Sequence, residues 1–552
     1  MSPRIRCIVI ALVFVALLPA AAAQASANQA SIMMDDDLLV YRDDNTASRV
    51  LTQMKTMGVD IIRVTVLWSV VAENARTTQA DLNKLRGRQN NRLREAALRQ
   101  NRRFRPTDPS TYPVRNWDRY DNLVRSAQNL GIRVYFNITG PGPAWAHETP
   151  PRAQRSLRAS WKPRPAAFRQ FVTAVGRRYS GTYRDENAGR TTLPRVSFWS
   201  LWNEPNQGGW LSPQWQRNSN GRYVPASPAI YRKLHQAGYQ GLATSGHTVD
   251  SDVILMGETA PLGSNTPSEK NPMRPGLFLR ELACVSSNGS SYTGASARAR
   301  SCGDLSTRGG LAANGYAHHP YTKNVSPLVR DSHRDSLTMA NISELGTLLD
   351  TLSARTNGAI RSGMPLFMTE FGFETNPPDR FSGVSLQLQA KYNQLGEYQA
   401  WQNPRIAAQA QFLLRDVAPV RNRRPGTKAY WFTYQSGLFF LNGTAKPAAF
   451  AYTMPFIATP HGADPATGGP LYSFWGQLRF LPDGAPDVAH IQWKPKDNST
   501  GWVTVGDPVP VDFRGYFQAA RVAPSAAPGE WRSLWVRPDG GEPSTSLSTD
   551  GS

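Results

Sequence analysis

The chain has 552 residues, of which 40% are hydrophobic and 15 are tryptophan. This composition excludes a disordered or fibrous protein and predicts a large globular one. The formal net charge is +21, which favours contact with anionic polymers. The densest basic run, residues 92–106, holds almost no aromatic residues and no nucleic-acid-binding motif, so we expect no nucleic acid partner. We expect a solvated basic loop there, with adhesion to anionic cell-wall polymers as the weaker alternative.

Residues 1–27 have the pattern of a secretory signal peptide. Arg4 and Arg6 precede an apolar run, a proline break and small-residue cleavage sites near Ala23 to Ala27. The apolar run is too short for a spanning helix, and no later segment reaches the roughly 18 apolar residues that one needs. We therefore expect an exported protein, secreted after cleavage, with no membrane span.

Between residues 28 and 460, short runs rich in β-branched and aromatic residues alternate with helical patterns. The expected strands are residues 31–34, 61–68, 132–139, 196–203, 253–259, 315–321, 366–373 and 428–435. Eight such strands separated by helices predict an α/β fold, a (β/α)8 TIM barrel with long insertions. A doubly wound sheet is less favoured, because no glycine-rich phosphate-binding turn follows the first strand.

The cysteines of an exported chain predict a disulfide. Cys7 leaves with the signal peptide, and Cys284 and Cys302 remain. An even pair in an oxidising compartment favours one bridge, which would close the Ser/Gly-rich loop between them. Two free thiols or a metal site is the alternative, which is weakened because no His or further Cys lies nearby at ligand spacing.

From residue 461 the pattern changes to a Gly/Pro-rich linker followed by short alternating strands. We expect an all-β sandwich module over residues 461–540 and a disordered polar tail over residues 541–552. The module could bind glycan or brace the barrel, and bracing is the commoner outcome. Its tryptophans, which would supply a binding face, are Trp475, Trp493, Trp502, Trp531 and Trp535.

Two carboxylates end strands of the predicted barrel. Glu204 lies in "LWNEPNQGGW" after the fourth strand, and Glu370 lies in "PLFMTEFGFET" after the seventh. Barrel enzymes place their chemistry at these strand ends, so the two side chains should face each other across the mouth. The tryptophans around Glu204 would favour its neutral form, which suits a proton donor, while Glu370 could stay ionised. Two carboxyl groups about 5–5.5 Å apart perform retaining glycoside hydrolysis.

The motifs "WNEPN" and "TEFGF" resemble those of the clan A retaining glycoside hydrolases, a superfamily of (β/α)8 barrels that includes families 5 and 39. The resemblance covers about residues 30 to 455 and implies that Glu204 is the acid/base and Glu370 the nucleophile. It also implies substrate-binding or nucleophile-positioning roles for Asn203, Arg63, His319, Tyr321 and Trp431. Asn203 would bind the sugar 2-hydroxyl, Tyr321 would bond the nucleophile, and Trp431 would floor the sugar site on strand eight.

Several of these residues also have plainer interpretations. Arg63 could be an ion-pair partner inside the barrel. His318 precedes His319 on a strand and must face the other way, so we expect it to be a packed core residue. Glu258 ends the fifth strand and could replace either carboxylate. The acidic run at residues 35–37 could bind sugar hydroxyls or lie in a solvated loop. Family 5 enzymes usually have a His near the end of strand three, where this chain has Asn137.

The sequence thus predicts a secreted, monomeric, retaining O-glycoside hydrolase that acts on a plant or microbial polysaccharide or oligosaccharide by double displacement. No cofactor and no metal site is expected, and the partner is the carbohydrate substrate. Two alternatives stay open. One is a transglycosylase that uses the same carboxylates, and the other is a non-catalytic glycan-binding or cell-wall adhesion protein.

Overall fold

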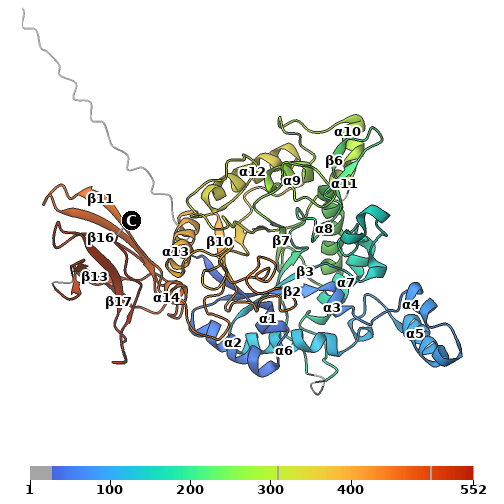
Figure 1. Cartoon of the computed structure of the whole chain (residues 1–552), viewed down its shortest axis with the longest axis horizontal. Helices are drawn as coiled ribbons and strands as arrows, with labels where there is room; N and C mark the ends of the chain where they lie inside the picture. The colour runs from blue at the N-terminus through green and yellow to red at the C-terminus, as the bar shows by residue number, and fades with distance from the viewer. Residues whose placement is uncertain (1–27, 188, 190, 308–309, 498–499, 551–552) are drawn as a thin grey trace, which may run out of the picture.

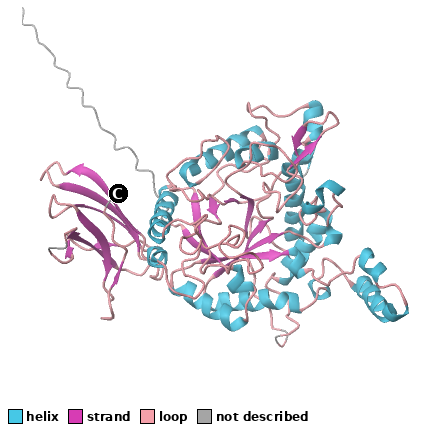
Figure 2. Cartoon of the chain, viewed as in Figure 1, coloured by secondary structure: helices cyan, strands magenta, loops and turns pink. Residues whose placement is uncertain are grey.

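The computed structural model describes residues 28–187, 189, 191–307, 310–497 and 500–550. The predicted signal peptide at residues 1–27 lies outside the described residues. Eight parallel strands form a closed barrel in the order β1-β10-β9-β8-β7-β4-β3-β2, and helices surround it (Figures 1 and 2). The predicted (β/α)8 barrel is therefore confirmed. In the described part of the chain, every helix is too short or too polar to cross a lipid bilayer.

Seven of the eight predicted barrel strands are confirmed and one is wrong. The barrel strands are β1 Ala30–Met34, β2 Ile61–Leu67, β3 Arg133–Thr139, β4 Phe198–Leu201, β7 Val253–Thr259, β8 Gly315–His318, β9 Leu366–Met368 and β10 Ile406–Phe412. The eighth strand is β10, whereas residues 428–435 form a loop. The loop has the aromatic composition of a strand but leaves Phe432 80% exposed. The true strand, "IAAQAQF", is rich in alanine and glutamine and carries a weaker strand pattern.

The helices around the barrel follow the expected alternation. They are α1 Asp36–Val40, α2 Asp44–Thr56, α6 Arg115–Asn129, α7 Pro165–Arg178, α8 Ser227–Thr244, α9 Pro275–Leu282, α12 Ile342–Arg355, α13 Leu386–Gln402 and α14 Pro447–Thr453. Helix α2 illustrates the local rules. The Asp43 carboxylate accepts a hydrogen bond from the Thr46 amide at its start, and Val50, Leu51 and Met54 are buried along one face.

Insertions after the strands add shorter elements. These are α3 Trp68–Val71, α4 Gln79–Lys84, α5 Asn91–Arg103, the β5 Trp215–Arg217 and β6 Tyr223–Pro225 hairpin, α10 Gly294–Ala299 and α11 Gly303–Thr307. The basic run was expected to be a loop, but α5 makes it a helix. Its many arginines are good helix formers, and the structure assigns no buried residue to α5. Figure 1 shows α4 and α5 standing away from the barrel, opposite the C-terminal sheets.

Alternation along the strands decides which side chains enter the barrel. Ile61 of β2 belongs to the cluster inside the barrel, whereas Ile62 and Val64 pack with the outer helices. The period of two therefore turns Arg63 inward, where it is fully buried. A buried guanidinium needs anionic partners, and the strand ends above it supply them.

The C-terminal residues form two antiparallel sheets, which confirms the predicted β-sandwich module. One sheet has the order β11-β12-β16 and the other β14-β13-β17-β18, with β15 also paired to β13. The strands are β11 Phe456–Ala463, β12 Pro470–Gln477, β13 Val488–Pro495, β14 Val503–Thr504, β15 Val509–Pro510, β16 Tyr516–Val522, β17 Gly529–Trp535 and β18 Ser544–Thr545.

Two expectations about the limits of this module need correction. The expected boundary at residue 461 falls inside β11, because its first residues already pair with β12. The expected disordered tail at 541–552 is ordered in its described part, since β18 pairs with β17 and Thr549 bridges Trp531. These backbone hydrogen bonds hold a polar segment whose composition carries no strand pattern.

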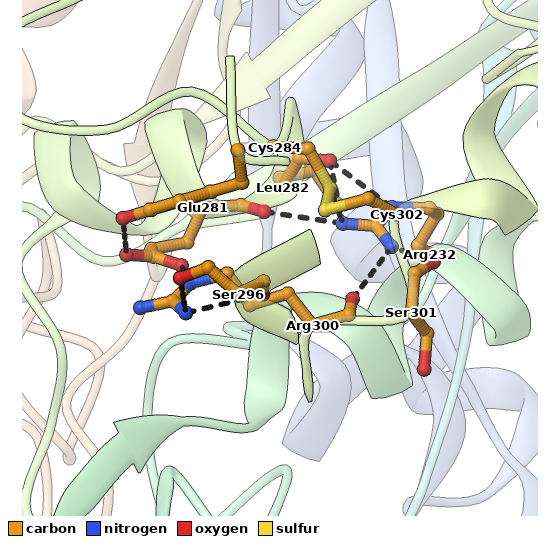
Figure 3. The surroundings of a disulfide bond; sticks show 9 residues. Arg232, Glu281, Leu282, Cys284, Ser296, Arg300, Ser301 and Cys302 are labelled. Carbon is orange, nitrogen blue, oxygen red and sulfur yellow. Dashed lines mark hydrogen bonds and ion pairs between the residues drawn. A yellow bond between two sulfur atoms is a disulfide. The ribbon is translucent and has the colours of Figure 1, made fainter. Parts of the chain in front are cut away.

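The predicted disulfide is present between Cys284 and Cys302, with a Cα–Cα distance of 5.7 Å. Figure 3 shows Arg232 of α8 beneath it. This guanidinium is fully buried and donates to the backbone carbonyls of Glu281, Leu282, Arg300 and Ser301. The bridge thus closes the loop, and Arg232 fixes the closed loop to α8.

Candidate active site

A cavity of about 780 Å³ opens at the C-terminal ends of the barrel strands. Four of the predicted site residues line it, namely Asn203, Glu204, Tyr321 and Glu370. They follow β4, β8 and β9, so three separate strands bring them together. Arg63 and His319 lie just beneath, fully buried, and contact these side chains. The structure thus gathers six of the seven predicted site residues at one end of the barrel.

Glu204 is held by an unusual backbone turn at the end of β4. Trp202 has φ 77° and Glu204 has φ 38°, a left-handed conformation that costs about 1–3 kcal/mol for a non-glycine residue. The turn is fixed because the Trp202 amide donates to Ile138 O at 2.8 Å and the Glu204 amide donates to Glu258 O at 2.9 Å. Such strain is common where a scaffold must aim a side chain into a site.

The tryptophans near Glu204 do not surround it as expected. Only Trp210 lines the cavity. Trp199 packs against Phe136 and His247, and Trp202 against Phe168, on the helical side of the barrel. The Glu204 side chain is 20% exposed, against 11% for Glu370. Apolar walls therefore do not distinguish the two carboxylates, and the expectation that Glu204 is the more desolvated one is wrong.

Glu370 has two strong donors. Arg63 Nη1 donates to Oε1 at 3.0 Å, and the Tyr321 hydroxyl donates to Oε2 at 3.1 Å. Burial raises the pKa of Glu370, while the charges of His319 and Arg63 oppose that rise. Hydrogen bonds from a cation and a phenol favour a carboxylate that is ionised and fixed in direction.

His319 lies between the two carboxylates. Its Nδ1 is 3.0 Å from Glu204 Oε1 and 3.5 Å from Glu370 Oε2, and its Nε2 is 2.7 Å from Glu258 Oε2. Burial alone would lower the pKa of His319, but the charge of Glu370 and the bonds to Glu204 and Glu258 raise it to about 10. The ring is therefore an imidazolium at neutral pH and donates from both nitrogens.

The neighbouring His318 behaves as expected for a core residue. Its Nδ1 bonds Thr259 Oγ1 and its Nε2 bonds Leu337 O, both at 2.8 Å. Burial lowers the pKa of His318 to about 3, so this ring stays neutral. The two adjacent histidines at the end of β8 thus hold different charge states because they face opposite sides of the barrel wall.

Glu258 carries no motif in the sequence, and the structure places it in the hydrogen-bond network beneath the cavity. It ends β7, has φ 51° and is fully buried. It does not line the cavity, so it is not a substitute for Glu204 or Glu370. Its carboxylate accepts hydrogen bonds from five side chains, which are Arg63, Tyr135, Ser200, His319 and Thr369. These bonds and the Arg63 charge hold its pKa well below the ordinary value, against the effect of burial.

Asn203 is oriented by Arg63, whose Nη2 donates to the amide oxygen at 2.8 Å. Since the oxygen is engaged, the amide nitrogen is the atom that could donate to a substrate hydroxyl. Asn137, at the position where family 5 enzymes carry a histidine, donates to Ser200 Oγ and Trp202 O. It therefore supports the turn before Glu204 rather than the cavity.

Trp431 is the predicted site residue that the structure does not bring to the cavity. It lies in the loop that was mistaken for the eighth strand and packs edge-on against Tyr430, with ring centroids 5.0 Å apart. Other aromatic side chains line the cavity instead, namely Tyr41, Trp210, Phe381, Phe412 and Tyr434. The misplaced strand explains the error, because Tyr434 lies three residues further along the same loop.

The acidic run at residues 35–37 is divided among three tasks. The Asp35 carboxylate accepts from the Leu38 and Arg415 amides and caps α1. Asp36 lines the cavity and accepts from the Thr65 amide. Asp37 forms an exposed ion pair with Arg42. Only Asp36 is in a position to contact a sugar.

One group of side chains has the spacing of a cation site. Glu204, His319 and Glu370 each offer a ligand atom, and these atoms lie within 4.8 Å of one another. A metal needs the lone pair of a neutral imidazole, whereas His319 keeps its proton at neutral pH.

No known family model matches the chain, and no curated protein matches it. Among solved structures, it is similar to a family 39 glycoside hydrolase from Bacteroides cellulosilyticus WH2, with 11% identity, a TM-score of 0.45 and coverage of 91% of this chain and 82% of that one. It is also similar to a GH5_18 protein from Streptomyces cattleya in complex with GlcNAc (13% identity, TM-score 0.39, 77% and 78% covered). A third similar structure is the virulence factor SghA with its substrate analog salicin (13% identity, TM-score 0.42, 78% of this chain and 95% of that one covered). These likenesses are too distant to assign an activity, so we derive the function from the side chains of the site.

Proposed function

We propose that this protein is a retaining O-glycoside hydrolase with Glu370 as nucleophile and Glu204 as acid/base. The observation that carries the proposal is the distance between the two carboxylates. An oxygen of one carboxylate lies within 4.8 Å of an oxygen of the other. This close approach favours the retaining arrangement, with carboxyl groups about 5–5.5 Å apart, over the wider pair of inverting enzymes, which leaves room for a water.

In the first step, a Glu370 oxygen attacks the anomeric carbon and forms a glycosyl ester. The bond from that carbon to the leaving oxygen breaks, and Glu204 gives this oxygen its proton. In the second step, Glu204 takes a proton from water, and the water oxygen displaces Glu370 from the sugar. Two displacements at one carbon return the original anomeric configuration.

The charges of the buried groups support this division of roles. Arg63 and His319 carry two positive charges, and Glu258 and Glu370 carry two negative ones, so the cluster is neutral when Glu204 holds a proton. A protonated Glu204 can still accept the His319 Nδ1–H at its carbonyl oxygen, Oε1, and keep the proton on Oε2. The count alone fits a proton on either carboxylate, but Arg63 and Tyr321 donate to Glu370 and favour its ionised form, so we assign the nucleophile to Glu370 and the donor to Glu204.

The remaining residues position these two. Arg63 and Tyr321 aim Glu370 through the bonds described above, and Asn203 is placed to bind the sugar hydroxyl next to the anomeric carbon. We propose a polysaccharide or oligosaccharide of plant or microbial origin as substrate, because the cavity is large enough for several sugar rings. We further propose that the protein is secreted, with residues 1–27 as signal, and acts as a monomer, since one chain supplies the whole site.

The test is an assay of the mature protein on a panel of aryl glycosides and polysaccharides. We expect Glu370→Gln to lose activity by about 10³-fold or more on every substrate. Glu204→Gln should lose it mainly on substrates with poor leaving groups, which need protonation. Glu374→Gln is the control, because Glu374 is another carboxylate of the same cavity. Proton NMR of the first product should show the substrate's own anomeric configuration.

Two results would count against this proposal. An inverted first product would remove the double displacement, and full activity of Glu370→Gln would remove the nucleophile. A product formed on an added acceptor sugar in preference to water would favour the transglycosylase alternative.

A further inference from the structure

The exposed apolar side chains of this protein are unevenly distributed. Fourteen large hydrophobic residues are exposed in the described part of the chain. Seven of them lie in the segments that follow three barrel strands at the cavity end. After β8 these are Val325, Leu328 and Val329, after β9 Phe381, and after β10 Phe432, Tyr434 and Leu441. We call these seven residues the mouth surface.

The mouth surface lies on one side of the barrel opening. Strands β8, β9 and β10 are consecutive neighbours in the closed barrel, so the segments after them emerge side by side. Arg380 Nη2 donates to Gly426 O at 2.8 Å, and the Thr375 amide donates to Gln435 O at 3.1 Å. These bonds tie the segment after β9 to the segment after β10.

The mouth surface is continuous with the cavity. Phe381 and Tyr434 line the cavity wall and are also 41% and 57% exposed. Lys323 and Asn324, which immediately precede Val325, line the same cavity. A molecule that enters the site therefore passes along these side chains.

The segment after β10 is basic. Residues 417–445 contain Arg421, Arg423, Arg424 and Lys428 and no aspartate or glutamate, and all four cations are exposed. Lys323 and Lys428 line the cavity. The segment after β10 thus combines the exposed Phe432, Tyr434 and Leu441 with four exposed cations.

This combination favours a particular kind of partner. Aromatic rings alone would suit a glycan chain, but the exposed valines and leucines offer no ring face to a sugar. Several exposed apolar side chains at one end of a domain favour a contact surface. Apolar side chains beside lysine and arginine match the interface of an anionic bilayer, which attracts each nearby cation by about 1 kcal/mol.

We propose that the mouth surface docks on an anionic lipid surface, with the barrel opening turned toward the headgroups. Phe432 and its neighbours insert among the acyl chains, and the arginines of residues 417–445 contact the anionic headgroups. Where the glycoside hydrolase function above also holds, the substrate is a glycoside presented at such a surface, and its sugar enters the cavity from the lipid side.

The test measures binding of the mature full-length protein to vesicles by sedimentation. We use vesicles of phosphatidylcholine alone and vesicles that also contain phosphatidylglycerol. We expect binding to the mixed vesicles, weakened by added salt. Phe432→Ser should weaken it by about tenfold. Phe513→Ser is the matched control, because Phe513 is 60% exposed in the C-terminal module and should leave binding unchanged.

A second pair of variants separates specific docking from the general attraction of a cationic protein. Arg423→Ser with Arg424→Ser should weaken binding by roughly tenfold or more. Arg102→Ser with Arg103→Ser, two adjacent exposed arginines of α5, should not. Unchanged thermal midpoints would show that every variant is folded, and Glu370→Gln should bind as tightly as the parent whether or not the glycosidase proposal holds.

The proposal is overturned if no vesicle binds, if the Phe432 and Phe513 variants lose binding equally, or if the two arginine pairs do. If the Phe432 and arginine variants lose binding to a soluble glycan but keep their binding to vesicles, the mouth surface binds an extended sugar chain instead.

Discussion

Glu258 connects the two buried cations beneath the cavity, although it does not line the cavity itself. It bonds Arg63 and His319, and these two cations in turn contact Glu370 and Glu204. A buried carboxylate at this point compensates both cations and fixes their orientation. We therefore regard Glu258 as a positioning residue, since it acts on the reacting groups only through its neighbours.

Replacing Glu258 should change the titration of His319. Glu258→Gln removes a negative charge and a charge-assisted hydrogen bond, so the pKa of His319 should fall from about 10. A ¹H–¹⁵N NMR titration of the histidine rings would measure it, with kcat/KM expected to fall by about 10²-fold. Asp252→Asn is the control. It removes the carboxylate partner of a different histidine, His247, and should leave the pKa of His319 unchanged. An unaltered His319 titration in Glu258→Gln would remove the positioning role.

The raised pKa of His319 also affects stability. A histidine with a folded-state pKa near 10 and an unfolded value near 6.5 stabilises the fold fully below pH 6.5. That contribution is lost as pH rises from 6.5 to 10. The wild-type protein should lose stability over this range by a larger amount than His319→Asn, as denaturant unfolding at several pH values would show. Equal losses in the two proteins would contradict the charged state of His319.

Tyr321 should tune the acid side of the pH profile. Its hydroxyl donates to Glu370 Oε2, which favours the ionised form, while burial raises the pKa of Glu370. In Tyr321→Phe this pKa should rise further. The acid limb of the pH–activity profile should therefore shift to higher pH, together with a roughly tenfold loss of kcat/KM. Tyr434→Phe, a change at another tyrosine of the cavity, should leave the acid limb in place. An acid limb that does not move would mean that the Tyr321 hydroxyl does not act on Glu370.

At the scale of residues, the side chains that meet at the site were predictable where the sequence carries a motif. Glu204 and Glu370 follow strands in recognisable contexts, and Arg63, His319 and Tyr321 are indeed in contact with them. Glu258 lies in "LMGET", which matches no motif, so only its position at a strand end marked it as a candidate site residue. Its importance comes from five partners on five different segments, and contacts of that kind arise only when the barrel closes.

At the scale of elements, composition predicted strands well where the strands are buried on both faces. Strand β2 has β-branched residues in nearly every position and was found within one residue. Strand β10 was missed because Gln409 and Gln411 are buried polar residues, a pattern that favours no strand. The Gln411 side chain donates to Phe412 O and Ser436 O, so tertiary hydrogen bonds compensate for its burial.

The loop from Cys284 to Cys302 gives a prediction at this scale. The bridge closes a loop with a sequence separation of 18, and removing it by Cys284→Ser with Cys302→Ser should cost about 3 kcal/mol of unfolding free energy. Arg232→Met should be destabilising as well, because it leaves two backbone carbonyls of the loop and two at the end of α9 without their donor. Urea unfolding would measure both, and Arg298→Met, on the exposed part of α10, should change little. A bridge-free protein of full stability would show that Arg232 alone holds the loop.

At the scale of the whole molecule, the tryptophans of the C-terminal module decide between glycan binding and bracing. Trp493, Trp531 and Trp535 are buried in the module's own core. Trp475 packs against Trp401 of α13, with ring centroids 5.8 Å apart. Trp502 lies beneath Lys494 and Arg532. These positions favour bracing, since four of the five rings are covered by protein.

The brace is anchored by one buried ion pair. Arg479, just after β12, pairs with Glu397 of α13 and donates to Tyr452 O at 2.7 Å. Its backbone also packs against Gly58, where a Cβ would lie 2.1 Å from the Arg479 carbonyl oxygen. Burial raises the pKa of Glu397 to about 7, against the effect of Arg479. The pair therefore joins module to barrel at a place where an uncompensated charge is costly.

Arg479→Met should destabilise the barrel and the module together, by about 3–5 kcal/mol near pH 8. The loss should be smaller near pH 5, because the buried Glu397 can then take up a proton and need not remain an unpaired anion. Removing both charges in Arg479→Met with Glu397→Met should recover much of the stability, since no charge is left buried. Urea unfolding followed by tryptophan fluorescence and by activity would measure these changes. If the module stabilises the barrel, fluorescence and activity change in one transition. If the module of Arg479→Met unfolds in an earlier step while activity is kept, the barrel does not need the module for its stability.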